Sequence, residues 1–178
     1  MLVPAACYKE EIEKQFKVIQ YSDKYLWYTG SIDNYDMEVK TEGDKFAFAI
    51  VTYIHDIEVL VGYISFRVDW YCSMAYNFSL IRFRTTPKSK RVMASAIREV
   101  IRMIEGFNLR RIDFRCISGN PAERGYWKIL KRIDMQKKYT IRHLVFTDNI
   151  RDWKGEYHNT VCFELLRGGL NYYVEDGI

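Results

Sequence analysis

The sequence predicts an α/β (α+β) fold built on a mixed central sheet, with a strand–helix–strand crossover and flanking helices. Apolar residues recur every three to four positions in three segments, as in amphipathic helices, and alternate or run together in six others, as in strands. The early strands follow one another directly and the later ones alternate with helices, so antiparallel and parallel pairing should share one sheet. The 178 residues, 48% of them hydrophobic, can bury a core without disulfides or a metal.

The first expected element is a helix over residues 8–20. Ile12, Phe16 and Ile19 recur on one side of it, and three glutamates occupy its first turn, where the helix dipole favours negative charge. The connection over residues 21–35 is aromatic and polar, and a helical turn can follow Ser22 and Asp23.

Three strands should follow, over residues 45–54, 59–68 and 74–83. The first is apolar on both faces, which is typical of a strand in the centre of a sheet. Residues 55–56 turn the chain between the first two strands, and Gly62 is a candidate β-bulge in the second.

The next expected elements are a helix over residues 89–105, stopped by Gly106, and a strand over 111–117. Since crossover connections are nearly always right-handed, strands 74–83 and 111–117 should pair in parallel with this helix across one face. The inner stripe of the helix consists of Met93, Ile97, Val100, Ile101 and Ile104.

A further helix should begin at Asn120 and Pro121, because Asn is a favoured cap and Pro a favoured first helical residue. Strands over residues 139–147 and 160–166 should close the fold, joined by a polar loop over 148–159. The inner stripe of this helix is Ala122, Tyr126, Ile129, Leu130 and Ile133.

We expect one domain over residues 1–166 and a loose tail over 167–178. The longest apolar stretch, residues 46–54, is far shorter than the roughly 20 residues of a membrane span, and the N-terminus does not resemble an export signal. The four cysteines form no CxxC or CxxH pair, so a zinc site is not expected. These features predict a cytoplasmic protein without a membrane partner.

Charge is strongly segregated along the chain. Residues 82–142 contain 17 Lys and Arg against 5 Asp and Glu, a net charge of +12, whereas the remainder carries −8. Such a stretch is typical of proteins that bind a polyanion, whether a nucleic acid, a phosphorylated cofactor or an acidic protein. The alternative is a solvated face that pairs with the acidic remainder.

The order of elements over about residues 8–166, with the stretch from Ile81 to Ile133, resembles the GNAT superfamily of acyl-CoA-dependent N-acyltransferases. The family has a strand, a loop with the pattern Arg/Gln-x-x-Gly-x-Gly/Ala, and a helix whose N-terminus holds the cofactor's pyrophosphate. Here Ser89, Val92 and Ala94 stand at the three motif positions. A Val in place of the first glycine departs from the family, because its β-carbon resists close approach of a phosphate.

Four basic residues flank this degenerate motif, and their charge could replace part of what the loop backbone supplies. They are Arg84, Lys88, Lys90 and Arg91. The resemblance therefore implies that acetyl-CoA is held by these four residues together with Ser89, Val92 and Ala94. The alternative is a basic helix start on the surface.

A second family signature is an Asn before the next helix and a Tyr one or two turns into it. Asn120 and Tyr126 match it, although many members have the Tyr one residue later, where Trp127 stands. The resemblance implies that Asn120 contacts the pantetheine arm of the cofactor and that Tyr126 protonates the departing thiolate. Their alternatives are a helix cap and core packing.

The resemblance also implies that a splayed strand binds the thioester oxygen through backbone amides. The residues concerned are Asn77, Phe78, Ser79 and Leu80. The family needs a general base as well, but no carboxylate lies in strand 74–83. Asp69, His143, His158 and Glu164 are the candidates, and none is singled out.

We therefore expect an N-acetyltransferase that transfers an acetyl group from acetyl-CoA to an unidentified amine by direct attack in a ternary complex, with Cys116 structural and no metal. Two alternatives stay open. One is a non-catalytic GNAT-like structural or binding protein, as occurs among phage and prophage proteins. The other is a nucleic-acid-binding domain that uses the basic segment 82–142.

Overall fold

The computed structural model describes residues 1–20, 38–40, 43–83, 89–132, 137–151 and 155–168. The expected connection over 21–35, most of the loop before the second long helix, and Ile133 lie outside these residues. In chain order the elements are β1 (Leu2–Pro4), the 3-10 helix η1 (Ala5–Tyr8), α1 (Lys9–Gln20), β2 (Lys45–Ile54), β3 (Ile57–Asp69), β4 (Met74–Arg82), α3 (Ser89–Gly106), β5 (Arg111–Ile117), α4 (Pro121–Leu130), β6 (Tyr139–Arg151) and β7 (Tyr157–Arg167).

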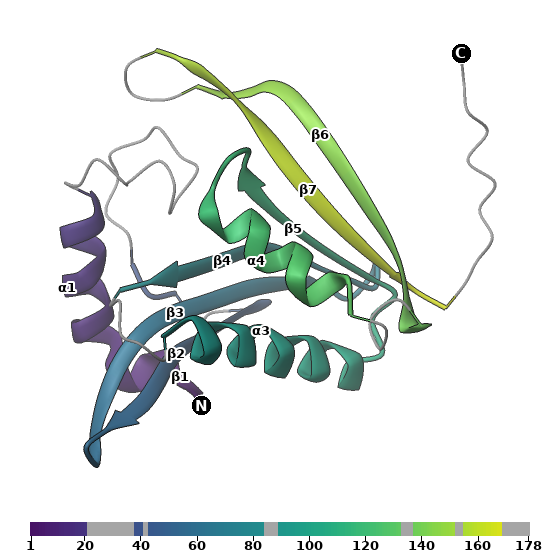
Figure 1. The fold of residues 1–178 in the computed structure, drawn as a ribbon. Helices are drawn as coiled ribbons and strands as arrows, with labels where there is room; N and C mark the ends of the chain where they lie inside the picture. The colour runs from purple at the N-terminus through teal and green to yellow at the C-terminus, as the bar shows by residue number, and fades with distance from the viewer. Residues whose placement is uncertain (21–37, 41–42, 84–88, 133–136, 152–154, 169–178) are drawn as a thin grey trace, which may run out of the picture.

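The strands form one mixed sheet in the order β1-β2-β3-β4-β5-β7-β6 (Figure 1). The only parallel neighbours among them are β4 and β5, which are joined by α3. The crossover expected from the sequence is therefore confirmed, and so is the α+β class with its mixed sheet and flanking helices.

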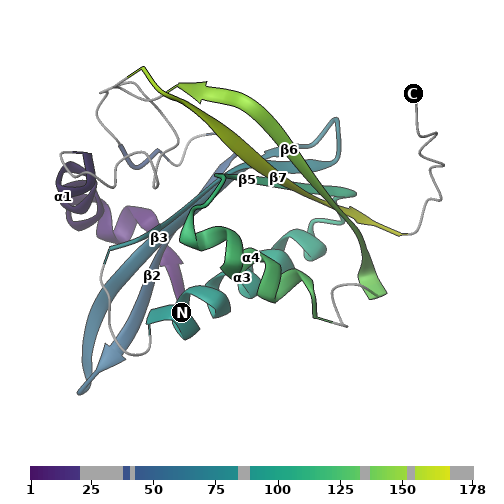
Figure 2. The same cartoon turned by 45° about the horizontal axis from the view of Figure 1, so that its top comes forward.

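Helices cover the two faces of the sheet unequally. The inner sides of α3 and α4 pack on one face across most of the sheet, and α1 with η1 packs on the opposite face of β2, β3 and β4 (Figures 1 and 2). β2 is apolar on both sides because it contributes Ile50 to the first core and Ala49 and Val51 to the second.

Four expectations need correction. Residues 2–4 form an unpredicted edge strand, β1, that pairs with Phe48–Ile50, so β2 lies inside the sheet only along that part. The closing hairpin is longer than expected: β6 continues to Arg151 and β7 begins at Tyr157, within the predicted polar loop. The helix expected to reach Ile133 ends at Leu130. β7 runs to Arg167, whose guanidinium donates to the Glu105 carbonyl, so this residue is tied to the fold rather than part of a tail.

The bulge expected at Gly62 is present beside it. Gly62 pairs with Ile50 and Leu60 with Val51, which leaves Val61 as the extra residue. A β-carbon on Gly62 would lie 2.4 Å from the Ile81 carbonyl oxygen of β4, so close packing of the two strands requires glycine here.

Among the described residues, no helix combines the length and the apolar character needed to cross a membrane.

Candidate functional site

The two parallel strands at the centre of the sheet diverge soon after they begin. β4 and β5 pair only at Met74 with Arg111 and at Ala75 with Ile112, after which they point apart (Figure 1). The divergence opens toward the carboxyl ends of both strands. Ligands in open α/β sheets bind at that end, so this region is the first candidate for a site.

A bulge in β4 lies where the divergence begins. Ser79 pairs with Ser65 and Tyr76 with Arg67, so Asn77 and Phe78 together oppose the single residue Phe66. Asn77 has φ 53°, in the left-handed region that few non-glycine residues adopt. A bulge of this kind turns the strand and changes the direction of its backbone groups. Residues 77–80, to which the resemblance assigns the thioester oxygen, thus include the bulge and the two residues after it.

The N-termini of two helices lie beyond the diverging ends. α3 begins at Ser89 after β4, and the amides of Ser89, Lys90 and Arg91 have no carbonyl four residues upstream within the helix. The Lys90 and Arg91 side chains are exposed there. An anion is favoured at such a helix end by both the amides and the dipole. Arg84, Lys88 and the side chain of Ser89 lie outside the described part of the chain.

The two remaining motif positions of α3 are turned inward. Val92 and Ala94 are half-buried and pack against the core formed by α3, α4 and the sheet. The side chain of Val92 is thus engaged with the core. The sequence alone left open whether its β-carbon would stand between the helix end and a phosphate.

Asn120 caps α4 as the sequence predicts. Its Oδ1 accepts a hydrogen bond from the Ala122 amide at 2.8 Å, and Pro121 occupies the first helical position. Glu123 adds to the cap because its Oε2 accepts from the Gly119 amide at 3.0 Å. The capping role of Asn120 is therefore observed, whereas a contact with a pantetheine arm stays a prediction.

Tyr126 lies in the core with its ring packed and its hydroxyl unpartnered. The ring centroid is 4.8 Å from that of Phe114 on β5 and 5.8 Å from that of Phe163 on β7, and the residue is 8% exposed. No hydrogen bond joins the hydroxyl to another described residue. Buried hydroxyls nearly always have a partner, so a buried hydroxyl without one among the described residues is unusual.

A row of rings connects the bulge to Tyr126. Phe78, in the bulge, lies edge-on to Phe114 with 6.0 Å between ring centroids, and Phe114 in turn contacts Tyr126. Side chains of the diverging strands and of α4 therefore meet within one apolar cluster. Burial raises the pKa of the Tyr126 phenol, so it stays protonated at neutral pH and can act only as a proton donor.

Cys116 is half-buried on β5, and burial raises the pKa of its thiol to about 12. The thiol is therefore protonated at neutral pH and is a poor nucleophile. This agrees with the structural role expected for Cys116.

The four candidate bases come from three strands, β3, β6 and β7. Asp69 is the last residue of β3, where a hydrogen bond that its Oδ1 accepts from the Cys72 amide at 2.8 Å lowers its pKa. His143 on the edge strand β6 stacks near Trp127, with 4.9 Å between ring centroids. Glu164 is held in ion pairs on β7. His158 is nearest the open end, because Thr160 pairs with Ile117, the last residue of β5, and His158 lies two residues closer to the start of β7, beyond the end of β5.

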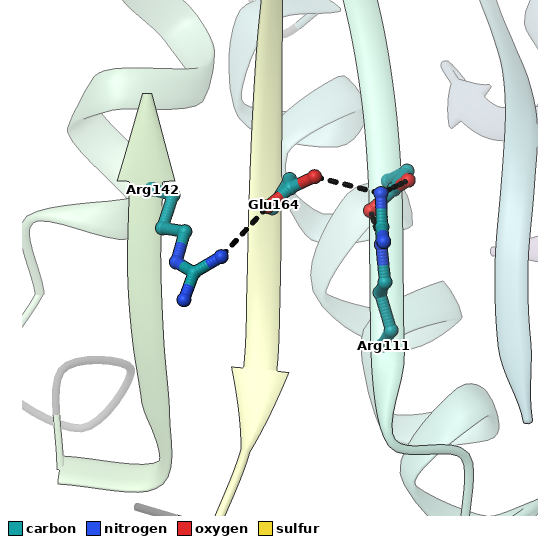
Figure 3. A network of polar contacts seen from close by, with 4 residues as sticks. Arg111, Arg142 and Glu164 are labelled. Atoms are coloured by element: carbon teal, nitrogen blue, oxygen red, sulfur yellow. Dashed lines mark hydrogen bonds and ion pairs between the residues drawn. The ribbon is translucent and has the colours of Figure 1, made fainter. Parts of the chain in front are cut away.

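A polar cluster that the sequence did not reveal lies on the face opposite α4 (Figure 3). Asp113 and Glu164 pair across β5 and β7, and both are nearly buried. Arg111 bridges them: its Nε and Nη2 bind the two Asp113 oxygens at 2.7 and 2.6 Å, and Nη2 also binds Glu164 at 2.7 Å. Arg142 lies 3.8 Å from the other Glu164 oxygen. The alternation of Arg111 and Asp113 in the sequence was a signal for this face, but their partner on β7 is 53 residues away from Arg111.

No family model matches this sequence, and neither does any curated protein. Solved structures do match. A probable GNAT-family acetyltransferase from Chromobacterium violaceum has a TM-score of 0.59 at 11% identity, covering 93% of this chain and 85% of its own. An aminoglycoside 6'-acetyltransferase type Ii has a TM-score of 0.56 at 10% identity, covering 93% and 96%. The spermidine/spermine N-acetyltransferase SpeG from Vibrio cholerae has a TM-score of 0.51 at 14% identity, covering 70% and 66%.

The chain spans less than two thirds of the length of some of its matches, for example 62% of a protein described as a probable acetyltransferase. The phage or prophage alternative gains no support from these structures. At such low identity the matches establish the fold alone, and they agree with the topology described above: this chain has the fold of the GNAT acetyltransferases.

Proposed function

We propose that the protein is an acyl-CoA-dependent N-acetyltransferase that transfers an acetyl group to an amine by direct attack in a ternary complex. The observation that carries the proposal is the divergence of β4 and β5 after two residue pairs, with the Asn77 bulge at its start. The helix N-termini at its open end and the unpartnered Tyr126 hydroxyl agree with it. Acetyl-CoA is the proposed co-substrate and supplies an activated thioester.

The described residues suit the charges of such a co-substrate. The amides at the start of α3, which have no carbonyl partner within the helix, and the exposed Lys90 and Arg91 would bind its phosphates, with Arg84 and Lys88 adding charge from the preceding loop. Asn120 would contact the pantetheine arm at the start of α4.

The chemical step needs two further contributions from the chain. Backbone amides of residues 77–80 would donate hydrogen bonds to the thioester oxygen, where negative charge develops during attack. The Tyr126 hydroxyl would deliver a proton to the departing sulfur, since a thiolate leaves more easily when it is protonated. Cys116 forms no bond to the acyl group in this scheme, because its thiol stays protonated.

The amine is proposed only as a class. Two proteins of the same fold are named for acetylating a polyamine and an aminoglycoside, so these are the first acceptors to test here. Release of free thiol in the presence of each amine would measure turnover.

Titration with acetyl-CoA tests the proposal most directly. At 100 times its dissociation constant the ligand should stabilise the protein by about 2.7 kcal/mol, seen as a rise in unfolding temperature. Replacing Lys90 and Arg91 with Gln should weaken acetyl-CoA binding more than that of a phosphate-free pantetheine thioester, because each charge-assisted contact contributes about 1.5–3 kcal/mol.

The matched control for this pair is Lys14→Gln with Lys17→Gln, which removes the same charge from the exposed side of α1. If the Lys90/Arg91 variant lost equal affinity for acetyl-CoA and for the phosphate-free thioester, these two cations would not contact phosphates. If millimolar acetyl-CoA did not raise the unfolding temperature of the wild type, the acetyltransferase proposal would be wrong.

Val92→Gly is expected to have opposite effects on binding and stability. It should tighten acetyl-CoA binding if the α3 N-terminus is a weakened cofactor site, because glycine lets a phosphate approach the backbone. It should also destabilise the fold by about 1–2 kcal/mol, since glycine lowers helix propensity and the half-buried Val side chain is lost. Calorimetry and urea unfolding measure the two effects. Absent binding before and after the change would mean that the loop no longer serves a cofactor.

One observation favours a second candidate, a non-catalytic GNAT-like binding protein. β4 carries no carboxylate that could serve as the base, and Val92 replaces the first motif glycine. A protein of this kind would keep the fold without turning over acetyl-CoA. Thermal stabilisation by acetyl-CoA without thiol release in the presence of any amine would favour this candidate over the enzyme.

A further inference from the structure

The outer side of the two helices that cover the sheet carries two rows of cations. On α3, Arg98 and Arg102 are four residues apart, and on α4 and just after it Arg124, Lys128 and Lys131 are spaced by four and three residues. These spacings place each row on one side of its helix, away from the inner stripe. We name this surface, made of Arg98, Arg102, Arg124, Lys128 and Lys131, the basic helix face.

The two rows belong to one surface, because α3 and α4 lie side by side on the same face of the sheet in both views (Figures 1 and 2). Packed helices have axes about 8–10 Å apart. Arg102, Arg124, Lys128 and Lys131 are exposed and Arg98 is half-buried. None of the five forms an ion pair with another residue that the structure describes.

Acidic residues on these helices do little to neutralise this charge. Glu105 accepts hydrogen bonds from Lys138 and Tyr139, and Glu123 accepts one from the Gly119 amide. Glu99 is the remaining acid of the two helices. The +12 charge of residues 82–142 is thus displayed in part on one surface rather than dispersed over the fold.

The side chains of this surface suit some anionic partners better than others. No large exposed hydrophobic side chain lies on α3 or α4 among the described residues, whereas membrane-binding helices insert such side chains and protein interfaces are centred on them. Single-stranded nucleic acids are bound by stacking on aromatic rings, and the one aromatic ring beside the face, Trp127, is half-buried and lies 5.1 Å from the Lys131 ammonium. The phosphates of a duplex can be bound by cationic side chains alone, without aromatic or apolar contacts.

We propose that the basic helix face binds the phosphate backbone of double-stranded nucleic acid without reading its sequence. Two rows of cations on neighbouring helices can contact phosphates of both strands across one groove, whose width is about 6–12 Å. Lys90 and Arg91, assigned above to the co-substrate, are not needed for this contact. The acetyltransferase proposal and this one can therefore be tested separately, and the failure of one does not decide the other.

The test is fluorescence anisotropy of a labelled mixed-sequence duplex of about 20 base pairs. Five phosphate contacts predict that log K falls with log salt with a slope of about −4 to −5. Reversing one charge in each row, Arg102→Glu with Lys128→Glu, should make this slope shallower by about two and weaken binding at least about tenfold at low salt.

The control reverses two exposed lysines of α1 on the opposite face, Lys14→Glu with Lys17→Glu, so that the change in net charge is identical. It should bind the duplex much more tightly than the Arg102/Lys128 variant. If the Arg102/Lys128 and Lys14/Lys17 variants lost equal affinity for the duplex, net charge alone would explain the effect, and this result would overturn the proposal. So would no duplex binding by the wild type at low salt, tighter binding of a single strand, or binding of phosphatidylserine vesicles in preference to the duplex. If charge reversal unfolds the protein, Arg102→Gln with Lys128→Gln and its Lys14/Lys17 counterpart repeat the comparison.

Discussion

Replacing Arg111 with Met should lower the free energy of unfolding by about 3 kcal/mol, the largest stability loss expected for a single partly exposed residue of this protein. Arg111 is the bridge between two carboxylates, Asp113 and Glu164, whose side chains are each 10% exposed, whereas its own is 40% exposed. Asp113 and Glu164 pair directly across the antiparallel strands β5 and β7, where like charges repel each other. Removing the cation leaves both carboxylates poorly solvated and facing each other. Urea unfolding at pH 7 measures the loss.

Two further variants separate this explanation from lost packing. Arg111→Met combined with Glu164→Gln should recover part of the stability, because one of the two facing charges is gone. Arg115→Met, four residues along the same strand and exposed, should cost about 1 kcal/mol or less, since Arg115 lies over the Phe146 ring at 5.4 Å. An Arg111→Met loss no larger than that of Arg115→Met would show that the network does not stabilise the fold.

The network also shows which contacts the sequence could not predict. The alternation over residues 111–117 predicts a strand with Arg111 and Asp113 on one side, and that prediction is confirmed. Their partner Glu164 comes from a strand that is distant in sequence, so nothing in the local pattern indicates that two carboxylates will meet. The same holds for β1, three residues long, which exists only because β2 offers an edge to pair with.

Local signals were strongest where one residue type has a single physical role. Asn120 and Pro121 mark the start of α4 because a cap and a residue without an amide hydrogen both fit that position, and the Ala122 amide is bound as expected. Polar residues over 148–159 suggested a loop, but a hairpin that extends past the edge of the core can be polar and still form strand pairs, as Ile150 with His158 shows.

The candidate site could be anticipated in part from its resemblance to a family, but its geometry could not. That strands 74–83 and 111–117 would be neighbours followed from the crossover rule, and the resemblance implied a splayed strand. The local sequence pattern indicated neither that pairing ends at Ala75 nor that a bulge forms at Asn77. The packing alternative for Tyr126 was equally consistent with the sequence, and only the three-dimensional arrangement reveals a buried hydroxyl without a described partner.

Tyr126→Phe should reduce turnover by about 10²–10⁴-fold with an amine acceptor, while acetyl-CoA affinity stays nearly unchanged. The ring remains packed between Phe114 and Phe163, so only the hydroxyl proton is lost. Because that hydroxyl is buried without a described hydrogen-bond partner, the variant should be as stable as the wild type or more stable. A steep loss of turnover without loss of stability is the signature of an acid, and a purely structural tyrosine would not produce it.

Trp127 is the matched control, one residue along α4 and about 100° round the helix. Its ring packs against Phe163 at 5.2 Å and His143 at 4.9 Å, so Trp127→Phe should lower stability through lost contact area and leave turnover within a few-fold. Thiol release and urea unfolding, measured on both variants, give the comparison. Unchanged turnover in Tyr126→Phe would remove Tyr126 from the chemistry, and the proton would then have to come from water or from a residue outside α4.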